Sequence, residues 1–379
     1  MRHIQQQYCF FNTNSRSYSE QKLYTDGEMG NMRTFFLIVM TLAIYMTQPA
    51  YCFATENQEP VKEEKHYPVS IVFENDLIGG TDEGYTNGFI MSISDPWRKE
   101  SDKKEQGLIF NLGDKLTVIP TEGREKRRTF AFGQAMLTPA DLEVKEYIED
   151  DWPYAGLLFG RIIWSYQNDK EADVFGILMG IIGPSSQADT TQIWVHEQID
   201  SEKPEGWDNQ LKDEFALNIS YEHKWKLYDS FKGKIHSASD MGWDFTSYAG
   251  GSLGNVMTDA HVGGIIRFGT GVNLFPSTIY RSGVGALPDI GYNPKAPFAY
   301  YFLLGLEGQS IFHSFAMDGN TFENTHDLDR ELFTASSFGG IGVGYKRFRL
   351  NIFSVRGTKR FKEQGSKHRY GSITLGWIF

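Results

Sequence analysis

The chain has 379 residues, a formal net charge of −11 and two cysteines. Its 40% hydrophobic and 22% charged residues are typical of a folded protein, and the acidic balance argues against nucleic-acid binding, which uses a basic surface. After the N-terminal region no apolar run approaches the roughly 20 residues of a membrane-spanning helix. A soluble enzyme and a β-barrel remain.

The first predicted element is a targeting segment. Arg33 precedes an apolar run over 35–46, and small residues follow up to Ala54. A basic residue, a short apolar stretch and small residues before a cleavage point form the pattern of a secretory signal peptide. We therefore predict a signal peptide over 32–54, with cleavage after Ala54.

The residues on either side of this segment complete the predicted organisation. Residues 1–31 have no pattern of their own, and we expect an over-extended start or an unstructured segment there. Cys9 and Cys52 both precede the predicted cleavage point. The mature chain, 55–379, would therefore have no thiol for catalysis, metal binding or disulfides. No linker rich in proline or serine interrupts it, which predicts a single domain.

Twelve segments of the mature chain alternate in the period of a β-strand. In 215–221, for example, Phe, Leu, Ile and Tyr alternate with Ala, Asn and Ser. An even number of strands is what a closed bacterial barrel normally requires. The predicted strands are 67–74, 85–95, 126–137, 152–166, 172–182, 214–227, 243–250, 259–273, 298–313, 332–346, 347–358 and 370–379.

The connections between these strands fall into two sets if the N-terminus faces the periplasm. Two periplasmic connections, 96–125 and 274–297, are longer than the short turns usual there, so we expect local helix or strand extension. The first three outward connections contain the densest polar chemistry of the chain. The outward set is 75–84, 138–151, 183–213, 251–258, 314–331 and 359–369.

The last ten residues give the clearest strand pattern. Ile373, Leu375, Trp377 and Phe379 share one face, and small or polar residues share the other. A soluble sandwich could end on such an edge strand, but a signal peptide and a mature chain without cysteine favour a barrel with its apolar face toward lipid. The predicted fold is an all-β, single-domain transmembrane antiparallel β-barrel of about twelve strands, with a partly filled lumen.

Three polar clusters lie in or beside the outward connections, and they contain the candidate site residues. The first is Phe73-Glu74-Asn75-Asp76 with Tyr85-Thr86-Asn87-Gly88; the second is Gln134 with Thr138-Pro139-Ala140-Asp141 and Asp150-Asp151-Trp152-Pro153-Tyr154-Ala155-Gly156; the third is Gly183-Pro184, Gln192, His196, Glu202, Pro204, Gly206-Trp207-Asp208, Gln210-Leu211 and Glu214.

In combination these clusters resemble the LpxR-type lipid A 3′-O-deacylases, outer-membrane enzymes of Gram-negative bacteria. The resemblance covers nearly all of the mature chain, from residue 68 to the end. It implies a twelve-stranded barrel and calcium-dependent hydrolysis of the 3′-linked acyloxyacyl chain of lipid A, with the active site near the outer leaflet. We accordingly expect a monomer in the outer membrane that acts on lipid A or lipopolysaccharide, without a nucleic-acid partner.

The resemblance also assigns roles to individual residues. His196 matches the catalytic histidine of the family, with Gln192 one turn before it and Glu202 six residues after it. Asn75 and Asp76 match the pair on the first strand.

Two further positions bear on the match. Thr86 corresponds to the hydroxyl of the second strand. Relatives usually have arginine before the Pro-Tyr-Ala-Gly element, where this chain has Trp152. This chain therefore has no basic group directly before that element, and Lys145 is the nearest candidate for contact with a lipid A phosphate.

The chemistry is also reasonable from the residues alone. Histidine has an unperturbed pKa near neutrality, so His196 can deprotonate a water that attacks an ester. Oxygen donors such as those of Asn75, Asp76 and Glu202 suit Ca²⁺, which would polarise the ester carbonyl as a Lewis acid. Glu202 could instead orient the imidazole. Gln192 and His196 would share one face if a helical turn forms there.

Two other functions remain open. A barrel phospholipase would use a serine nucleophile, and Ser185 or Ser186 is a candidate although neither has a Gly-x-Ser-x-Gly context. A small pore or an adhesin would need no catalytic residues. The sequence does not indicate the acyl-chain preference, the phosphate requirement or the regulation in the native membrane.

Overall fold

The computed structural model describes residues 67–75, 84–99, 113, 119, 122–230, 241–270, 275–276, 298–365 and 367–379, without the side chains of 84–86 and 199. The predicted signal peptide, residues 1–31 and Asp76 lie outside this part of the chain. The described residues form two units, one of 194–201 and one of all the others.

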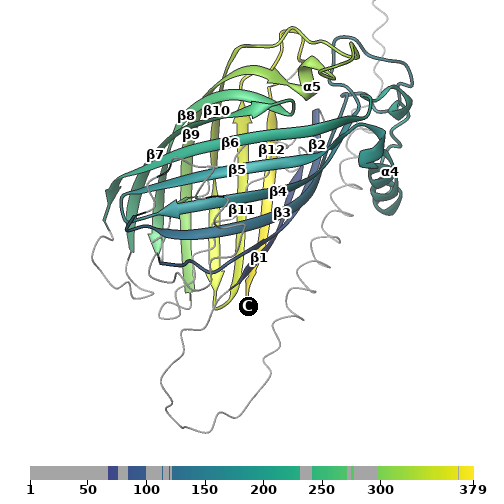
Figure 1. Cartoon of the computed structure of the whole chain (residues 1–379). Helices are drawn as coiled ribbons and strands as arrows, with labels where there is room; N and C mark the ends of the chain where they lie inside the picture. Colours follow the sequence, from purple (N-terminus) through teal and green to yellow (C-terminus); the bar gives the residue numbers. More distant parts are fainter. Residues whose placement is uncertain are drawn as a thin grey trace, which may run out of the picture. The chain divides into compact units, whose positions relative to one another are not determined.

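The larger unit is a closed barrel in which every strand pairs antiparallel with both neighbours (Figure 1). The predicted fold class and all twelve predicted strands are confirmed. The strands are β1 (Pro68–Asn75), β2 (Gly84–Ser94), β3 (Glu125–Thr138), β4 (Ala155–Gln167), β5 (Glu171–Ile182), β6 (Glu214–Asp229), β7 (Met241–Gly254), β8 (Met257–Thr270), β9 (Phe298–Ser314), β10 (Phe333–Tyr345), β11 (Phe348–Gly357) and β12 (Arg369–Ile378).

The first and last strands close the barrel. Residues of β1 pair with β12 from Pro68 opposite Ile378 to Asn75 opposite Gly371. Beyond this ladder, the backbones of Tyr67 and Phe379 exchange two hydrogen bonds of 3.2 Å. Closure leaves no unpaired strand edge, which is the condition for a sheet to cross a lipid bilayer.

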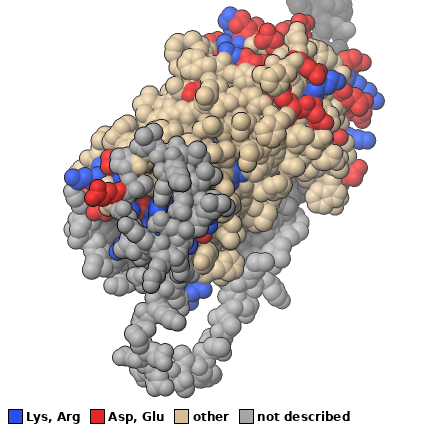
Figure 2. Space-filling model, viewed as in Figure 1, with Lys and Arg blue, Asp and Glu red and all other residues tan. Residues whose placement is uncertain are grey.

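The alternation in β6 shows which face of the wall meets lipid. Phe215, Leu217, Ile219 and Tyr221 are exposed, whereas the residues between them are buried or half-buried. Apolar side chains on the outside and polar ones inside are the reverse of a soluble protein and typical of a membrane barrel. Figure 2 shows the same arrangement as a broad band of uncharged residues between charged ends.

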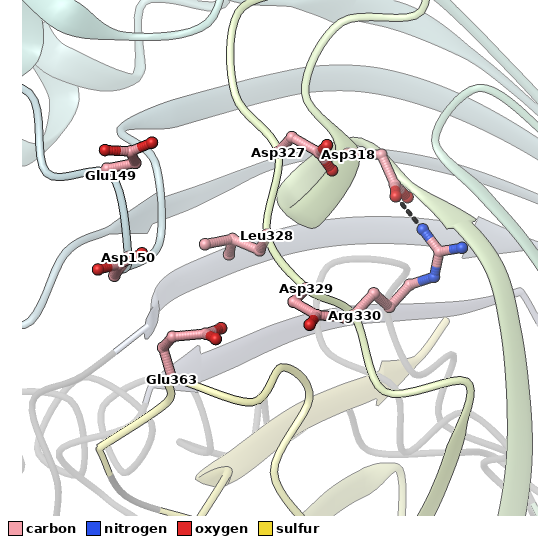
Figure 3. A pocket seen from close by; sticks show the side chains of 8 residues that line it. All are labelled: Glu149, Asp150, Asp318, Asp327, Leu328, Asp329, Arg330 and Glu363. Carbon is pink, nitrogen blue, oxygen red and sulfur yellow. Dashed lines mark hydrogen bonds and ion pairs between the residues drawn. The ribbon is translucent and has the colours of Figure 1, made fainter.

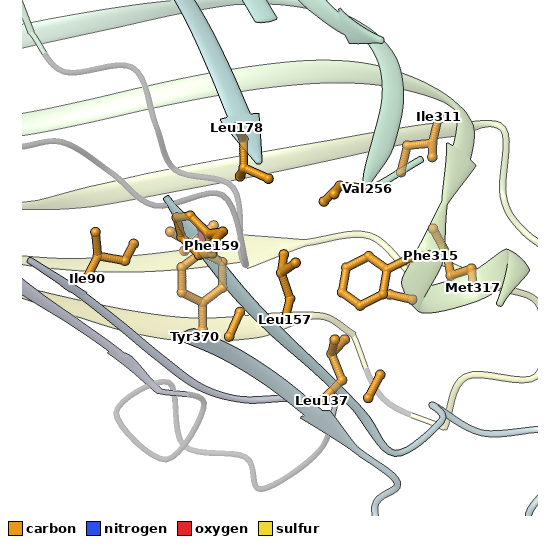
Figure 4. Packing of buried hydrophobic residues seen from close by; sticks show 14 of the residues in the cluster. Ile90, Leu137, Leu157, Phe159, Leu178, Val256, Ile311, Phe315, Met317 and Tyr370 are labelled. Atoms are coloured by element: carbon orange, nitrogen blue, oxygen red, sulfur yellow. The ribbon is translucent and has the colours of Figure 1, made fainter. Parts of the chain in front are cut away.

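Side chains occupy part of the barrel interior. The Arg267 guanidinium donates to Asp244 over 3.0 Å, and Tyr248 donates to Glu307 over the same distance. Buried apolar residues form a cluster inside the barrel. This cluster extends to Met317 in the short helix α5 (Phe315–Asp318) (Figure 4). The predicted partly filled lumen is therefore confirmed.

Two predicted boundaries are wrong by several residues. β4 begins at Ala155 and not at 152, because the segment before it packs in the loop instead of joining the ladder. β7 runs to Gly254 and β8 starts at Met257, so the outward connection predicted over 251–258 shrinks to two residues.

Two of the other outward connections contain helices. Between β5 and β6 lie η2 (Pro184–Ser186), α4 (Ala188–Ile199) and η3 (Trp207–Asn209), and α5 follows β9. Figure 1 places α5 at the end of the barrel opposite the C-terminus, and this end is called the loop rim below. No helix in the described residues has the length and apolar character needed to span a membrane.

Candidate active site

Two of the predicted site residues, Asn75 and Thr86, lie where their strands reach the loop rim. Asn75 is the last residue of β1 and is half-buried. Asp76, which follows it, lies outside the described residues. Thr86 lies in β2, where the structure describes only its backbone. The structure thus places Asn75 and the backbone of Thr86 on adjacent strands of the barrel.

The next two predicted residues lie on one helix. Gln192 and His196 both belong to α4, so the expected helical spacing of i,i+4 is confirmed. Gln192 is buried in the barrel unit. His196 is half-buried and belongs to the 194–201 unit, where its carbonyl accepts a 3.0 Å hydrogen bond from the Ser201 N–H. Glu202 is exposed on the loop that follows.

The Gln192 side chain is held by a single identified partner. The indole Nε1–H of Trp207 donates to Gln192 Oε1 over 2.8 Å. Both side chains are buried, with 2% of Gln192 and 6% of Trp207 exposed. The contact ties the long connection after β5 to helix α4 at Gln192.

The Pro-Tyr-Ala-Gly and Gly-Trp-Asp elements are far apart in the sequence but pack together around Trp207. The Tyr154 ring lies 5.0 Å from the Trp207 ring, and the Tyr154 carbonyl accepts from the Leu211 N–H over 3.0 Å. A side chain at Gly206 would overlap the Tyr154 ring. The Pro-Tyr-Ala-Gly and Gly-Trp-Asp elements are therefore packing partners, and their function is to fix this loop on the barrel.

The segment after β5 is seated on the rim in a similar way. Gly183 donates its N–H to the Gly156 carbonyl over 2.9 Å, and Gln134 Nε2 donates to the Ser186 carbonyl over 2.7 Å. Gly183 has φ +97° with the Lys212 backbone against it, a position that only glycine fills without strain. These contacts set the start of α4, and hence the place of Gln192.

The two serines of the alternative mechanism are both poorly placed for catalysis. Ser186 is completely buried, and its hydroxyl has no hydrogen-bond partner among the described residues. Ser185 is exposed, but its Oγ donates to the carboxylate of Asp213 over 2.7 Å. In the hydrogen bonds identified for the described part of the chain, neither hydroxyl has a histidine partner that could act as its base.

Trp152, which stands where relatives usually have arginine, fills an apolar pocket. Its ring contacts Phe361 edge-on at 5.1 Å and tilts against His368 at 6.5 Å. Burial, and after it the charge of Arg360, lowers the pKa of His368 to about 3, so this imidazole is neutral at physiological pH. Lys145 is exposed and pairs with Glu205 at 3.2 Å. Its contact with a lipid A phosphate stays a prediction.

An acidic cavity of about 550 Å³, which the sequence analysis did not predict, lies at the loop rim. Six carboxylates surround it, and Arg330 pairs with one of them, Asp318 (Figure 3). Three different loops supply its walls. Asp150 of the second polar cluster is on its lining, whereas Asn75, Gln192, His196 and Glu202 are not. The lining residues are Glu149, Asp150, Asp318, Asp327, Leu328, Asp329, Arg330 and Glu363.

The predicted calcium ligands have oxygen donors of the type that Ca²⁺ prefers. An amide oxygen from Asn75 followed by a carboxylate from Asp76 is a donor pair that suits Ca²⁺. Within the described ranges, which exclude Asp76, no group of three or more His, Cys, Asp or Glu side chains is arranged to hold a metal ion. The calcium site therefore stays a prediction that involves Asn75, Asp76 and Glu202.

Comparison with known proteins gives a family and a fold. The family model for "Outer membrane protein LpxR" matches residues 35–379. LpxR from Salmonella typhimurium has a similar structure, with a TM-score of 0.65 and 15% identity over 82% of this chain and 100% of that one.

Two other barrels match with lower scores. The KdgM porin has a TM-score of 0.34 and 6% identity, covering 82% of this chain and 99% of its own. The β domain of the Bordetella autotransporter BrkA has a TM-score of 0.36 and 9% identity, covering 83% and 98%. Among curated proteins no sequence matches the chain.

Proposed function

Because the chain belongs to the LpxR family of outer-membrane proteins, we propose that it is an esterase that removes the 3′-linked acyloxyacyl chain of lipid A. Its location is the outer membrane of a Gram-negative bacterium. The observation that carries the proposal is helix α4, which bears Gln192 and His196 one turn apart at the positions of the family motif.

In the proposed reaction His196 is the general base. Its imidazole takes a proton from a water molecule, and the water oxygen attacks the carbonyl carbon of the 3′ ester. When the tetrahedral intermediate collapses, the bond from the carbonyl carbon to the 3′ oxygen breaks, and that oxygen takes the proton back from His196. The products are a free acyloxyacyl fatty acid and a lipid A with a 3′ hydroxyl.

The remaining residues have supporting roles in this proposal. Gln192 and the Thr86 hydroxyl would hydrogen-bond the reacting ester. Asn75, Asp76 and Glu202 would hold Ca²⁺, and Glu202 could alternatively orient the imidazole. When bound, the calcium ion would supply positive charge next to the ester carbonyl.

Mass spectrometry of lipid A from cells with and without the protein tests the proposal. Expression of the wild type should shift lipid A by the mass of the acyloxyacyl chain, and His196→Ala should lose roughly 10²–10⁴-fold in rate while still folding as a barrel. A loss of less than tenfold would rule out the general-base role. Unchanged lipid A together with hydrolysed phospholipids would favour the phospholipase alternative.

Calcium is tested on the same assay. Chelation should abolish the activity and added Ca²⁺ should restore it. Asp76→Ala should raise the calcium concentration required, since it removes a hard oxygen donor, whereas His196→Ala should leave calcium affinity nearly unchanged. Equal loss of calcium binding in both variants would make His196 a metal-site or structural residue.

The two alternatives have their own tests. Ser185→Ala and Ser186→Ala should keep full activity, and abolished activity in either variant would revive the serine nucleophile. The partly filled lumen, with buried pairs such as Arg267–Asp244, supports an enzyme over a pore. Steady ion conductance in planar bilayers, without deacylation of purified lipid A, would favour the pore.

A further inference from the structure

We infer that Trp207 is a positioning residue for the reaction: its indole N–H fixes the carboxamide of Gln192 so that the amide N–H groups are presented to the carbonyl oxygen of the scissile ester. The inference rests on the proposed function and extends it to a residue that touches no substrate. It is carried by the contact between the two buried side chains at the loop rim.

The hydrogen bond fixes which way the amide points. An indole nitrogen can only donate, so the atom 2.8 Å from Trp207 Nε1 must be the amide oxygen of Gln192. The NH₂ group consequently lies on the opposite side. An amide rotated by half a turn would place two donors against each other and lose this bond.

We assign the contact with the ester oxygen to the amide nitrogen of Gln192. It is buried and has no hydrogen-bond partner among the described residues. Buried polar groups in folded proteins almost always have a partner, and a ligand or a water molecule can complete the bond of one that lacks it. One turn further along α4 is His196, the proposed base. An N–H donor near the attacked carbonyl is suited to the negative charge that develops on its oxygen.

Trp207 is in turn prevented from moving. Its ring packs on Tyr154 at 5.0 Å, in a buried cluster that also includes Met136, Leu142 and Ala188. Its backbone carbonyl accepts from the Gln210 N–H over 3.1 Å. The indole of Trp207 is therefore a rigid hydrogen-bond donor, and this donor holds the flexible Gln192 side chain in one orientation.

The first test separates binding from catalysis in purified protein with lipid A as the substrate. Gln192→Glu keeps an acceptor for Trp207 but has no N–H donor, and kcat should fall roughly 10²–10³-fold with little change in KM. Trp207→Phe keeps the ring and removes the donor, and we expect a fall in kcat of about tenfold. A change confined to KM, or no change in kcat for Trp207→Phe, would overturn the inference.

Trp152→Phe is the matched control. Trp152 is also buried at the rim, and its Nε1 has no hydrogen-bond partner among the described residues. The same substitution there removes similar volume but no bond to an amide, so kcat should stay at the wild-type value. If Trp152→Phe and Trp207→Phe lower kcat and thermal stability equally, the role of Trp207 is only structural.

A double-mutant cycle tests whether Trp207 acts through Gln192. In a Gln192→Leu background, Trp207→Phe should cause no further loss of kcat, because there is no amide left to orient. Losses that multiply would show an independent role for Trp207 and contradict the inference.

Hydrogen exchange of the Trp207 indole proton tests the contact with Gln192 without any enzymatic turnover, so its outcome does not depend on the proposed function. In protein labelled with ¹⁵N-tryptophan, the indole proton of Trp207 should exchange slowly with solvent, and Gln192→Leu should accelerate this exchange. Unchanged exchange would refute the hydrogen bond. Slow exchange in a wild-type protein that does not deacylate lipid A would refute the proposed function and keep the contact.

Discussion

The hydroxyl of Tyr147 lies 2.7 Å from Nδ1 of His326, although 179 positions separate the two residues in the sequence. The contact joins the connection between β3 and β4 to the connection between β9 and β10. Burial, followed by the charges of Glu149, Asp327 and Asp150, raises the pKa of the Tyr147 hydroxyl. The phenol is therefore protonated at neutral pH, and it shares a hydrogen bond with the imidazole.

The first prediction concerns the pH dependence of this contact. Burial lowers the pKa of His326 below its ordinary 6.5, although the Asp151 backbone and the Asp327 charge act in the opposite direction. The unfolded loop takes up a proton near pH 6.5, whereas the folded loop resists it. Its stability is therefore complete above that pH and decreases as the pH falls toward the lower folded-state pKa.

Hydrogen exchange of the 315–332 backbone, corrected for the intrinsic effect of pH, checks this. Exchange in the wild type should be faster at about pH 5 than at about pH 7.5. In His326→Gln the difference should disappear, because glutamine does not titrate. Slower exchange at the lower pH would contradict the sign argued here.

The second prediction concerns the glycine of the Pro-Tyr-Ala-Gly element. A Cβ at Gly156 would overlap Ser186 Oγ and the Ala188 Cβ, whereas a Cβ at Gly160, four residues along the same strand, meets nothing within 4 Å. Gly156→Ala should push away the start of α4 and reduce the proposed deacylase activity at least tenfold in a barrel that still folds. Gly160→Ala should leave the activity unchanged, and equal effects would refute the packing argument.

The third prediction tests the ion pair inside the barrel. Asp244 is completely buried and accepts from Arg267 over 3.0 Å. Asp244→Ala should lower the free energy of unfolding by about 3–5 kcal/mol, because a buried guanidinium loses its carboxylate. Urea unfolding in detergent micelles measures the change. Replacing both residues with leucine should cost less than the single change, and a larger cost would mean that the pair itself stabilises the barrel.

The fourth prediction concerns barrel closure. Deletion of Phe379 removes both backbone hydrogen bonds with Tyr67 at the end of the β1–β12 seam. The amount of folded, heat-modifiable barrel in the outer membrane should fall, while the activity per folded molecule stays near the wild-type value. Unchanged insertion would show that the terminal residue is dispensable for closure.

The sequence by itself determined the barrel. The alternation in 215–221 and 373–379 is a local property, since successive side chains of a strand point to opposite faces and a membrane wall needs one apolar face. The strand count and the helical spacing of Gln192 and His196 followed from such short-range patterns. They did not depend on knowing which strands pair.

The tertiary structure alone decided how the loops meet. Nothing periodic in the sequence indicates that Trp207 would donate to Gln192, that Tyr154 would lie under Trp207, or that Tyr147 would reach His326. The boundaries near Ala155 and Gly254 were misplaced for the same reason, because the neighbours of those segments decide where pairing stops. Contacts between irregular segments far apart in the chain depend on side-chain shape and burial in the folded state, which no local pattern records.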